Sequence, residues 1–245
     1  MPRWRRGIIM DTIDRAAGSA EAAARLLTWL SPSFPVGAFS YSHGLEYAAE
    51  AGLVGDRDTL VAWIEGILCH GAGRVDGMLL LEAHRSVTRA DAERLRDVVE
   101  LAAALRGSAE LALESNAQGA AFWKAIGAGW PTLAQAAILR PLADAGVLSY
   151  PVTVGAVTAA SGINEVAVLY AYLTAFCGIL VSSAQRLLPI GQSQSLAAIA
   201  SLEPTIARQV ALLRAAPFEN LGSAALMVDW CSMSHETQET RLFRS

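Results

Sequence analysis

Lysine is almost absent from this sequence, since Lys124 is the only one among 245 residues. There is no Walker A loop, and the Gly-Ala-Gly segment at 71–73 is not followed by a lysine. Phosphate binding of the P-loop kind is therefore excluded. The formal net charge is −4 and the arginines form no basic stripe, so we expect no nucleic-acid partner.

Cysteine and histidine are scarce too. The three cysteines, Cys69, Cys177 and Cys231, lie far apart and none belongs to a CxxC motif. This pattern favours reduced thiols and a cytoplasmic location over a disulfide framework. None of the four histidines forms an HxxxH or HxxEH pair, so we expect no metal site and no cofactor. His84 is predicted to be a surface residue of a helix.

Motifs of nucleophilic catalysis are missing as well. The chain has neither a GxSxG nor an SxxK sequence. The neighbouring Ser42 and His43 keep a small serine hydrolase open as an alternative. Nothing in the sequence supplies their acid partner or an oxyanion hole. We predict no catalytic residue and no enzymatic activity.

Hydrophobic residues are abundant, at 53% of the chain against 17% charged residues. They recur at spacings of three and four, and no stretch alternates with period two, which predicts an all-α fold of one domain with roughly ten helices. The segment 152–157 is compatible with a strand or a close-packed helix. We expect a flexible N-terminal tail at 1–15, the helical domain at 16–233 and a docking tail at 234–245. The expected helices cover 16–30, 45–51, 59–71, 78–86, 91–105, 108–126, 132–142, 164–187, 193–199, 205–214 and 222–231.

Residues 166–185 carry no charge, and a run of this length matches a membrane span. The run contains Thr174, Ser182 and Gln185, and no basic loops flank it to set an orientation. We therefore expect a central buried helix, N-capped by Asn164, and no membrane contact. An integral membrane protein that uses 166–185 as its span is the alternative.

The stretch 31–46 reads SPSFPVGAFSYSHGLE. Pro32, Pro35 and Gly37 prevent regular helix there, so the segment is predicted to be an ordered loop. Its rings, those of Phe34, Phe39 and Tyr41, must pack against the protein's own core or against a partner. Ser40 or Ser42 is the expected cap of a helix that begins near His43.

Two further segments stand out. At 184–192, Ala-Gln-Arg-Leu-Leu-Pro-Ile-Gly-Gln, the charge-free helix ends with Arg186 before Pro189 and Gly191. A cation at this position stabilises the helix C-terminus by up to about 1 kcal/mol. At 235–245, His-Glu-Thr-Gln-Glu-Thr-Arg-Leu-Phe-Arg-Ser, an apolar pair lies between two arginines. This composition is expected of an exposed tail that becomes ordered on docking.

These three segments, in this order, resemble the UreF family of urease accessory proteins. Ile190 stands where the family usually has leucine, and Glu239 stands where it has tyrosine. A weaker likeness covers 110–122, so the resemblance spans about residues 30–245.

The resemblance implies an all-α protein without a catalytic site. It implies an adaptor that binds UreD (UreH in some organisms) and the GTPase UreG, supports nickel delivery to apo-urease, regulates GTP hydrolysis by UreG and forms homodimers. The implied partner-binding residues are Phe34, Phe39, Tyr41, His43, Glu46, Glu236, Arg241, Leu242, Phe243 and Arg244. The implied structural residues are Pro32, Pro35, Gly37, Arg186, Pro189, Gly191 and Gln192.

Overall fold

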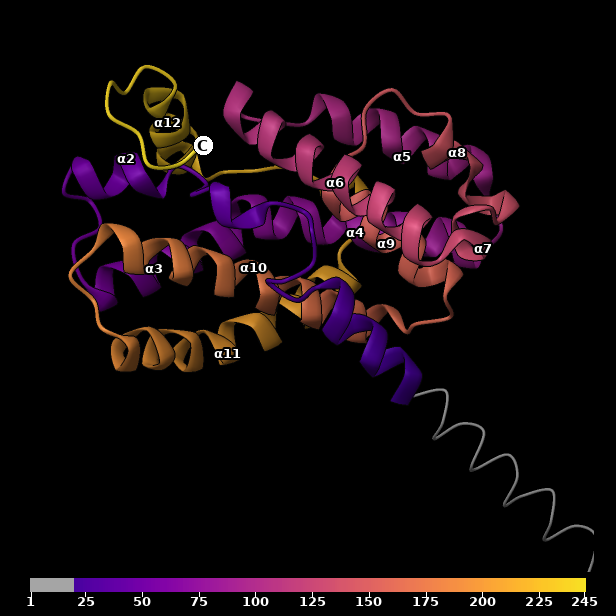
Figure 1. Ribbon diagram of the computed structural model, residues 1–245, viewed down its shortest axis with the longest axis horizontal. Helices are drawn as coiled ribbons and strands as arrows, with labels where there is room; N and C mark the ends of the chain where they lie inside the picture. The colour runs from indigo at the N-terminus through magenta and orange to yellow at the C-terminus, as the bar shows by residue number, and fades with distance from the viewer. Residues whose placement is uncertain (1–19) are drawn as a thin grey trace, which may run out of the picture.

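The computed structural model describes residues 20–245. The predicted N-terminal tail at 1–15 and the first turn of the helix expected from residue 16 lie outside the described residues. Over 20–245 the chain is helical and contains no strand, which confirms the all-α, single-domain prediction (Figure 1). The segment 152–157 lies within a helix.

The order of elements follows the sequence pattern closely. After a helix at residues 20–29 come η1 (Ala38–Ser40), α2 (Leu45–Glu50), α3 (Arg57–His70), α4 (Ala72–Thr88), α5 (Ala92–Ala104), α6 (Ala109–Gly129), α7 (Pro131–Ala134), η2 (Ala137–Leu139), α8 (Arg140–Ala143), α9 (Tyr150–Ala160), α10 (Glu165–Leu187), α11 (Gln192–Ala215), η3 (Phe218–Asn220) and α12 (Leu226–His235).

Polar side chains begin several of these helices. Asp56 accepts a hydrogen bond from the Thr59 amide at the start of α3, and Asn164 accepts one from the Val166 amide at the start of α10. Ser108 does the same for the Leu111 amide in α6. Each bond satisfies an amide that has no acceptor within the helix itself. The predicted cap at Asn164 is thereby confirmed, and Asp56 is the cap of α3.

Helix α4 forms the centre of the bundle and packs most extensively against α9. Their backbones approach closely at Gly155, where a Cβ atom would lie 2.3 Å from the Leu80 carbonyl oxygen. Only glycine fits at such a crossing, because a side chain would force the two helices apart. The core around this crossing holds α4 nearly completely buried.

Helices α10 and α11 lie side by side along one edge of the molecule (Figure 1). Both are long and apolar enough to cross a membrane by length and composition. The expected central buried helix, α10, is only partly buried, because Tyr170 is 40% exposed and Ala167 and Thr174 are exposed on the same face. About 44% of its apolar window is buried.

Three details differ from the sequence prediction. Pro204 lies inside α11, so 193–199 and 205–214 belong to one helix. The packing of α11 against α10 and α3 outweighs the cost of about 3 kcal/mol of an interior proline. The expected helix at 132–142 is divided into α7, η2 and α8. His84 is buried, and its Nε2 lies 2.8 Å from the Ile163 carbonyl oxygen.

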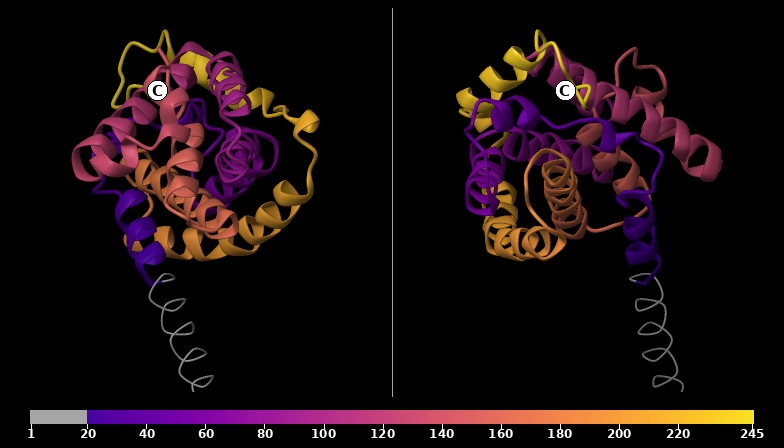
Figure 2. Two further views of the ribbon diagram at one scale, coloured as in Figure 1. Left: turned by 90° about the vertical axis from the view of Figure 1, so that its right-hand side faces the viewer. Right: turned by 60° about the vertical axis from the view of Figure 1, so that its left-hand side comes forward.

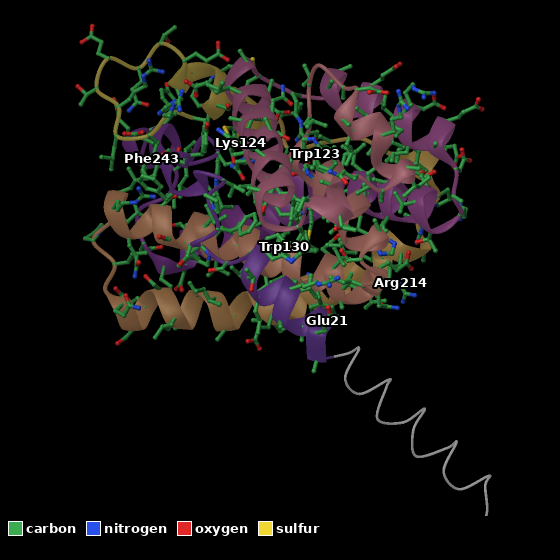
Figure 3. The ribbon with its side chains drawn as sticks, turned by 45° about the vertical axis from the view of Figure 1, so that its right-hand side comes forward. Glu21, Trp123, Lys124, Trp130, Arg214 and Phe243 are labelled. Carbon is green, nitrogen blue, oxygen red and sulfur yellow. The ribbon has the colours of Figure 1, made fainter. Side chains whose placement is uncertain are left out.

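The described ends of the chain lie far apart. Figure 2 shows the C-terminal segment and α11 at opposite edges of the bundle, and Figure 3 shows Phe243 across the molecule from Glu21 and Arg214. At residues 20–29 the helix is attached by Trp29, which is fully buried and packs edge-on against Trp130 at a centroid distance of 5.2 Å.

Candidate functional site

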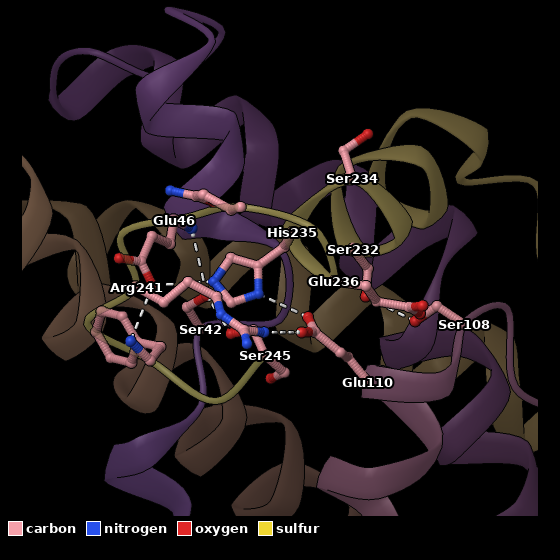
Figure 4. A network of polar contacts seen from close by, with 12 residues as sticks. Ser42, Glu46, Ser108, Glu110, Ser232, Ser234, His235, Glu236, Arg241 and Ser245 are labelled. Atoms are coloured by element: carbon pink, nitrogen blue, oxygen red, sulfur yellow. Dashed lines mark hydrogen bonds and ion pairs between the residues drawn. The ribbon is translucent and has the colours of Figure 1, made fainter.

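The C-terminal residues 236–245, here called the strap, fold back over α2 and the start of α6 (Figure 4). The Ser42 amide donates to the Ser245 carbonyl at 2.8 Å, and the Arg244 amide donates to the Ser40 carbonyl at 2.8 Å. The Ser42 hydroxyl also donates to the Ser245 carbonyl. The structure thus places this segment on the protein's own surface with Phe243 only 4% exposed, whereas the sequence predicts an exposed tail.

The carboxylate of Glu46, in the first turn of α2, receives the strap backbone. It accepts hydrogen bonds from the Leu242 amide at 2.6 Å and the Phe243 amide at 2.9 Å. The same carboxylate lies 3.0 Å from Nε2 of His235. A buried carboxylate with several donors is well compensated for the loss of water. Glu46 therefore joins α2, the end of α12 and the strap.

Glu110 plays the corresponding part on α6. Its carboxylate lies 2.7 Å from Nδ1 of His235 and accepts from the Arg241 guanidinium at 3.0 Å. His235 is completely buried between two carboxylates, one at each ring nitrogen. Each ring nitrogen of His235 therefore has a carboxylate oxygen within hydrogen-bonding distance.

Glu114, one turn after Glu110, continues the network. Its Oε2 lies 3.3 Å from Nδ1 of His43 and accepts from the Ser245 hydroxyl at 2.9 Å. Residues at i and i+4 share one helix face, so α6 presents both carboxylates to the strap. Glu236 contributes from the other side, because its carboxylate accepts from the Ala109 amide at the N-terminus of α6.

Arg186 connects the loop at 31–46 with the strap. Its guanidinium lies 4.1 Å from the ring centroid of Phe243 and 5.9 Å from that of Phe39, and it donates to the Phe39 carbonyl at 2.8 Å. Arg186 also donates to the Ser183 hydroxyl at 3.2 Å, so its side chain joins the end of its own helix to the loop. The aromatic rings and the loop carbonyl attract the guanidinium away from the helix axis. Burial lowers the pKa of Arg186.

An apolar stripe lies beside the strap on the outward face of α12. It consists of four exposed side chains, Leu226 (78%), Met227 (52%), Trp230 (46%) and Met233 (47%). Trp230 packs edge-on against Tyr47 of α2 at 5.3 Å between centroids. Phe39 and Leu242 are also exposed. Clustered apolar side chains of this kind mark interaction surfaces, whereas isolated ones do not.

The remaining loop residues divide between core and surface. Phe34 packs against Phe122 and Trp130, with centroids 5.4 and 6.4 Å apart, and so faces the protein's own core. Tyr41 is buried, and desolvation raises its pKa. Gly37 has φ +72°, a conformation that favours glycine. Pro32 and Pro35 are exposed.

The segment after α10 connects the end of α10 to the start of α11. Pro189 and Gly191 are exposed, and the Gly191 amide donates to the Gln194 side chain as α11 begins. Gln192 accepts from the Gln185 side chain at 3.0 Å, which ties the start of α11 to the end of α10.

Glu110, Glu114 and His235 belong to the network and are absent from the sequence-predicted site residues. The four-residue spacing of the two glutamates is visible in the sequence, but nothing there indicates that α12 returns to α6. Charged residues on an amphipathic helix usually face solvent, so their spacing alone does not reveal burial.

The chemistry of a hydrolase is not favoured at Ser42. The residue is completely buried, and its hydroxyl is engaged by the Ser245 carbonyl and the Glu46 amide. His43 points its Nδ1 at Glu114 instead of at Ser42. Across residues 20–245, no group of three or more His, Cys, Asp or Glu side chains is arranged to hold a metal ion.

Comparison with known proteins matches this chain to the UreF family model over residues 54–203. It is 47% identical over 238 residues to a urease accessory protein UreF of Rhodopseudomonas palustris (strain BisB5), covering 96% of this chain and 97% of that protein. It is also 47% identical over 223 residues to the UreF of Methylorubrum populi, covering 91% and 99%. These matches over nearly the full length show that the chain belongs to the UreF family of urease accessory proteins.

Proposed function

We propose that this protein is a non-catalytic adaptor of urease maturation. It binds UreD (UreH) and the GTPase UreG in the cytoplasm, supports the transfer of nickel to apo-urease and regulates GTP hydrolysis by UreG. Nickel is the cargo of the complex in this proposal, and the chain itself needs no cofactor. Membership of the UreF family supports the role in urease maturation.

The observation that carries the adaptor proposal is the apolar stripe of α12 next to the strap. Four large apolar side chains are exposed on this ten-residue helix, and clustered exposed apolar side chains mark interaction surfaces. Trp and Met are also enriched in the buried centres of protein interfaces. Arg241 and Arg244 border this region through the strap and supply a polar rim. We assign this surface to UreD.

A pull-down from cells that co-express the chain with UreD and UreG tests the proposal. Trp230→Ala combined with Met233→Ala should reduce UreD capture at least tenfold, because truncating central aromatic residues costs about 2 kcal/mol or more. Leu196→Ala, at an exposed leucine of α11, is the matched control and should leave capture unchanged. Failure of the unmodified chain to capture either protein would refute the adaptor function.

A homodimer is the second part of the proposal. The helix at 20–29 and the outward face of α10 form an apolar groove, with Leu27 77% exposed and Tyr170 40% exposed. We assign this groove to a second copy of the chain. Light scattering of the purified protein should give twice the monomer mass, and Leu27→Glu with Tyr170→Glu should give the monomer.

Cell fractionation tests the membrane-spanning alternative. Recovery of the protein in the membrane pellet would favour that alternative, and recovery in the supernatant would favour the adaptor.

A further inference from the structure

A small cavity lies behind His43, between the loop at 31–38, α6 and α10. Its volume is about 40 Å³, and a water molecule needs at least about 10–15 Å³ on the same measure. Val36, Ala38 and Phe176 supply apolar walls, and Arg106 and Gln118 supply polar groups. There is room for more than one water molecule.

Two residues that line this cavity each have a buried polar atom without a partner within the described chain: His43 at Nε2 and Arg106 at Nε. Both side chains are more than nine-tenths buried, at 7% and 8% exposure. The other nitrogens of Arg106 are engaged by Asp76 and Ser149 at 2.8 Å each. An unpaired buried polar group destabilises the fold, so a ligand that satisfies both atoms is favoured.

The backbone holds His43 at the cavity wall in an uncommon conformation. Its φ of 57° is in the left-handed region, which residues other than glycine seldom adopt. Such conformations persist where the surroundings require them and cluster at functional positions. The two nitrogens of the His43 ring differ in their surroundings. Nδ1 faces Glu114, and Nε2 has no partner within the described chain.

We propose that this cavity is a built binding site for ordered water, which hydrogen-bonds both His43 Nε2 and Arg106 Nε. The charges around it favour a neutral occupant. The carboxylates of Asp76 and Glu114 lie in the wall and disfavour an anion, while the guanidinium of Arg106 disfavours a cation. Water both donates and accepts, so it suits either protonation state of the His43 ring.

The water site has a consequence for the strap. His43 is held by water on one side and by Glu114 on the other, and Glu114 accepts from Ser245. Displacing the water leaves Nε2 unsatisfied, and the ring is expected to turn away from Glu114. The end of the strap then loses part of its support. This coupling goes beyond the proposed adaptor function and does not depend on it.

The first test is a crystal structure, with a second crystal pressurised with xenon. Density for water within hydrogen-bonding distance of His43 Nε2 and Arg106 Nε, without bound xenon, is the expected result. Dry apolar cavities bind xenon, so a xenon atom in this cavity would overturn the proposal. An anomalous signal from an ion at the same place would overturn it as well.

The second test fills the cavity. Ala175→Leu on α10 enlarges a residue that lines the cavity, whereas Ala171→Leu, one turn earlier, enlarges one that lines only the outer groove. We expect Ala175→Leu to remove the water density and to increase trypsin cleavage after Arg241 several-fold, with no such change in Ala171→Leu. Equal cleavage of the two variants would refute the coupling between the water site and the strap.

Discussion

Nε2 of His235 lies 3.0 Å from Oε2 of Glu46, although the two residues are 189 positions apart in the chain. This contact joins the end of the last helix to the beginning of α2 and holds the strap between them. Because the same carboxylate also accepts hydrogen bonds from two strap amides, the position of the strap depends on where the Glu46 side chain is held.

Replacing His235 should release the strap. His235→Ala removes the ring that lies between the carboxylates of Glu46 and Glu110, and a buried polar group left without its partner costs about 1–3 kcal/mol. We expect a lower midpoint of chemical unfolding and faster trypsin cleavage after Arg241 and Arg244. Glu239→Ala, at an exposed strap residue, should cleave at the unmodified rate. Unchanged cleavage of His235→Ala would show that the strap is held by other contacts.

Arg186 should contribute to the strap through its charge. Arg186→Met keeps much of the side-chain volume but removes the cation from the Phe243 ring and the hydrogen bond to the Phe39 carbonyl. The expected loss is about 1–2 kcal/mol, together with faster hydrogen exchange at the amides of Phe243 and Arg244. Arg140→Met, which breaks only an exposed ion pair with Asp144, is the control. If the two variants lose the same stability and exchange their amides at the same rate, the Arg186 charge does not hold the strap.

Gly155 should tolerate no side chain. A Cβ atom there would lie 2.3 Å from the Leu80 carbonyl oxygen, so Gly155→Ala must separate α4 from α9, at a cost of about 1–3 kcal/mol. Gly127→Ala is the matched control, because no atom lies within 4 Å of its Cβ position and alanine favours helix by up to about 1 kcal/mol. Thermal unfolding should therefore shift in opposite directions. A stabilised Gly155→Ala variant would show that the two backbones are not this close.

Stability should decrease in mild acid through His84. Burial lowers the pKa of this histidine below its ordinary value of 6.5, and its hydrogen bond to the Ile163 carbonyl only partly opposes the shift. The unfolded chain therefore takes up the proton first as the pH falls. The contribution of His84 to the free energy of unfolding is fully present above about pH 6.5. It is lost as the pH falls from there through the folded-state pKa of His84.

The measurement is urea unfolding of wild type and His84→Gln between pH 5 and about pH 8. Glutamine can still donate to the Ile163 carbonyl but does not titrate, so its stability should vary less steeply, by up to about 1.4 kcal/mol per pH unit. His70→Gln, at an exposed histidine, should retain the wild-type slope. Parallel curves for wild type and His84→Gln would rule out a contribution from His84.

Local chemistry in the sequence determined the helices and several of their ends. The three-and-four spacing of apolar residues identified the all-α class, and Asn164 marked a helix start by the free amide that it satisfies. Pro204 misled the same reasoning, because its local cost is outweighed by the packing of α11 along its whole length. The resemblance of three short segments to the UreF family was likewise readable from the sequence alone, and the comparisons confirm it.

Only the tertiary structure decided where the charged residues of the site go. Glu46, Glu110 and His235 come from three helices, and a period of 3.6 residues cannot show that their faces meet. It also decided that Arg186 turns toward Phe39 and Phe243. The Phe39 carbonyl and the two aromatic rings come within reach of the guanidinium only when the loop and the strap fold together. Sequence periodicity records which face of a helix is apolar. Burial of polar groups depends on partners that are distant in the chain, and folding alone brings these together.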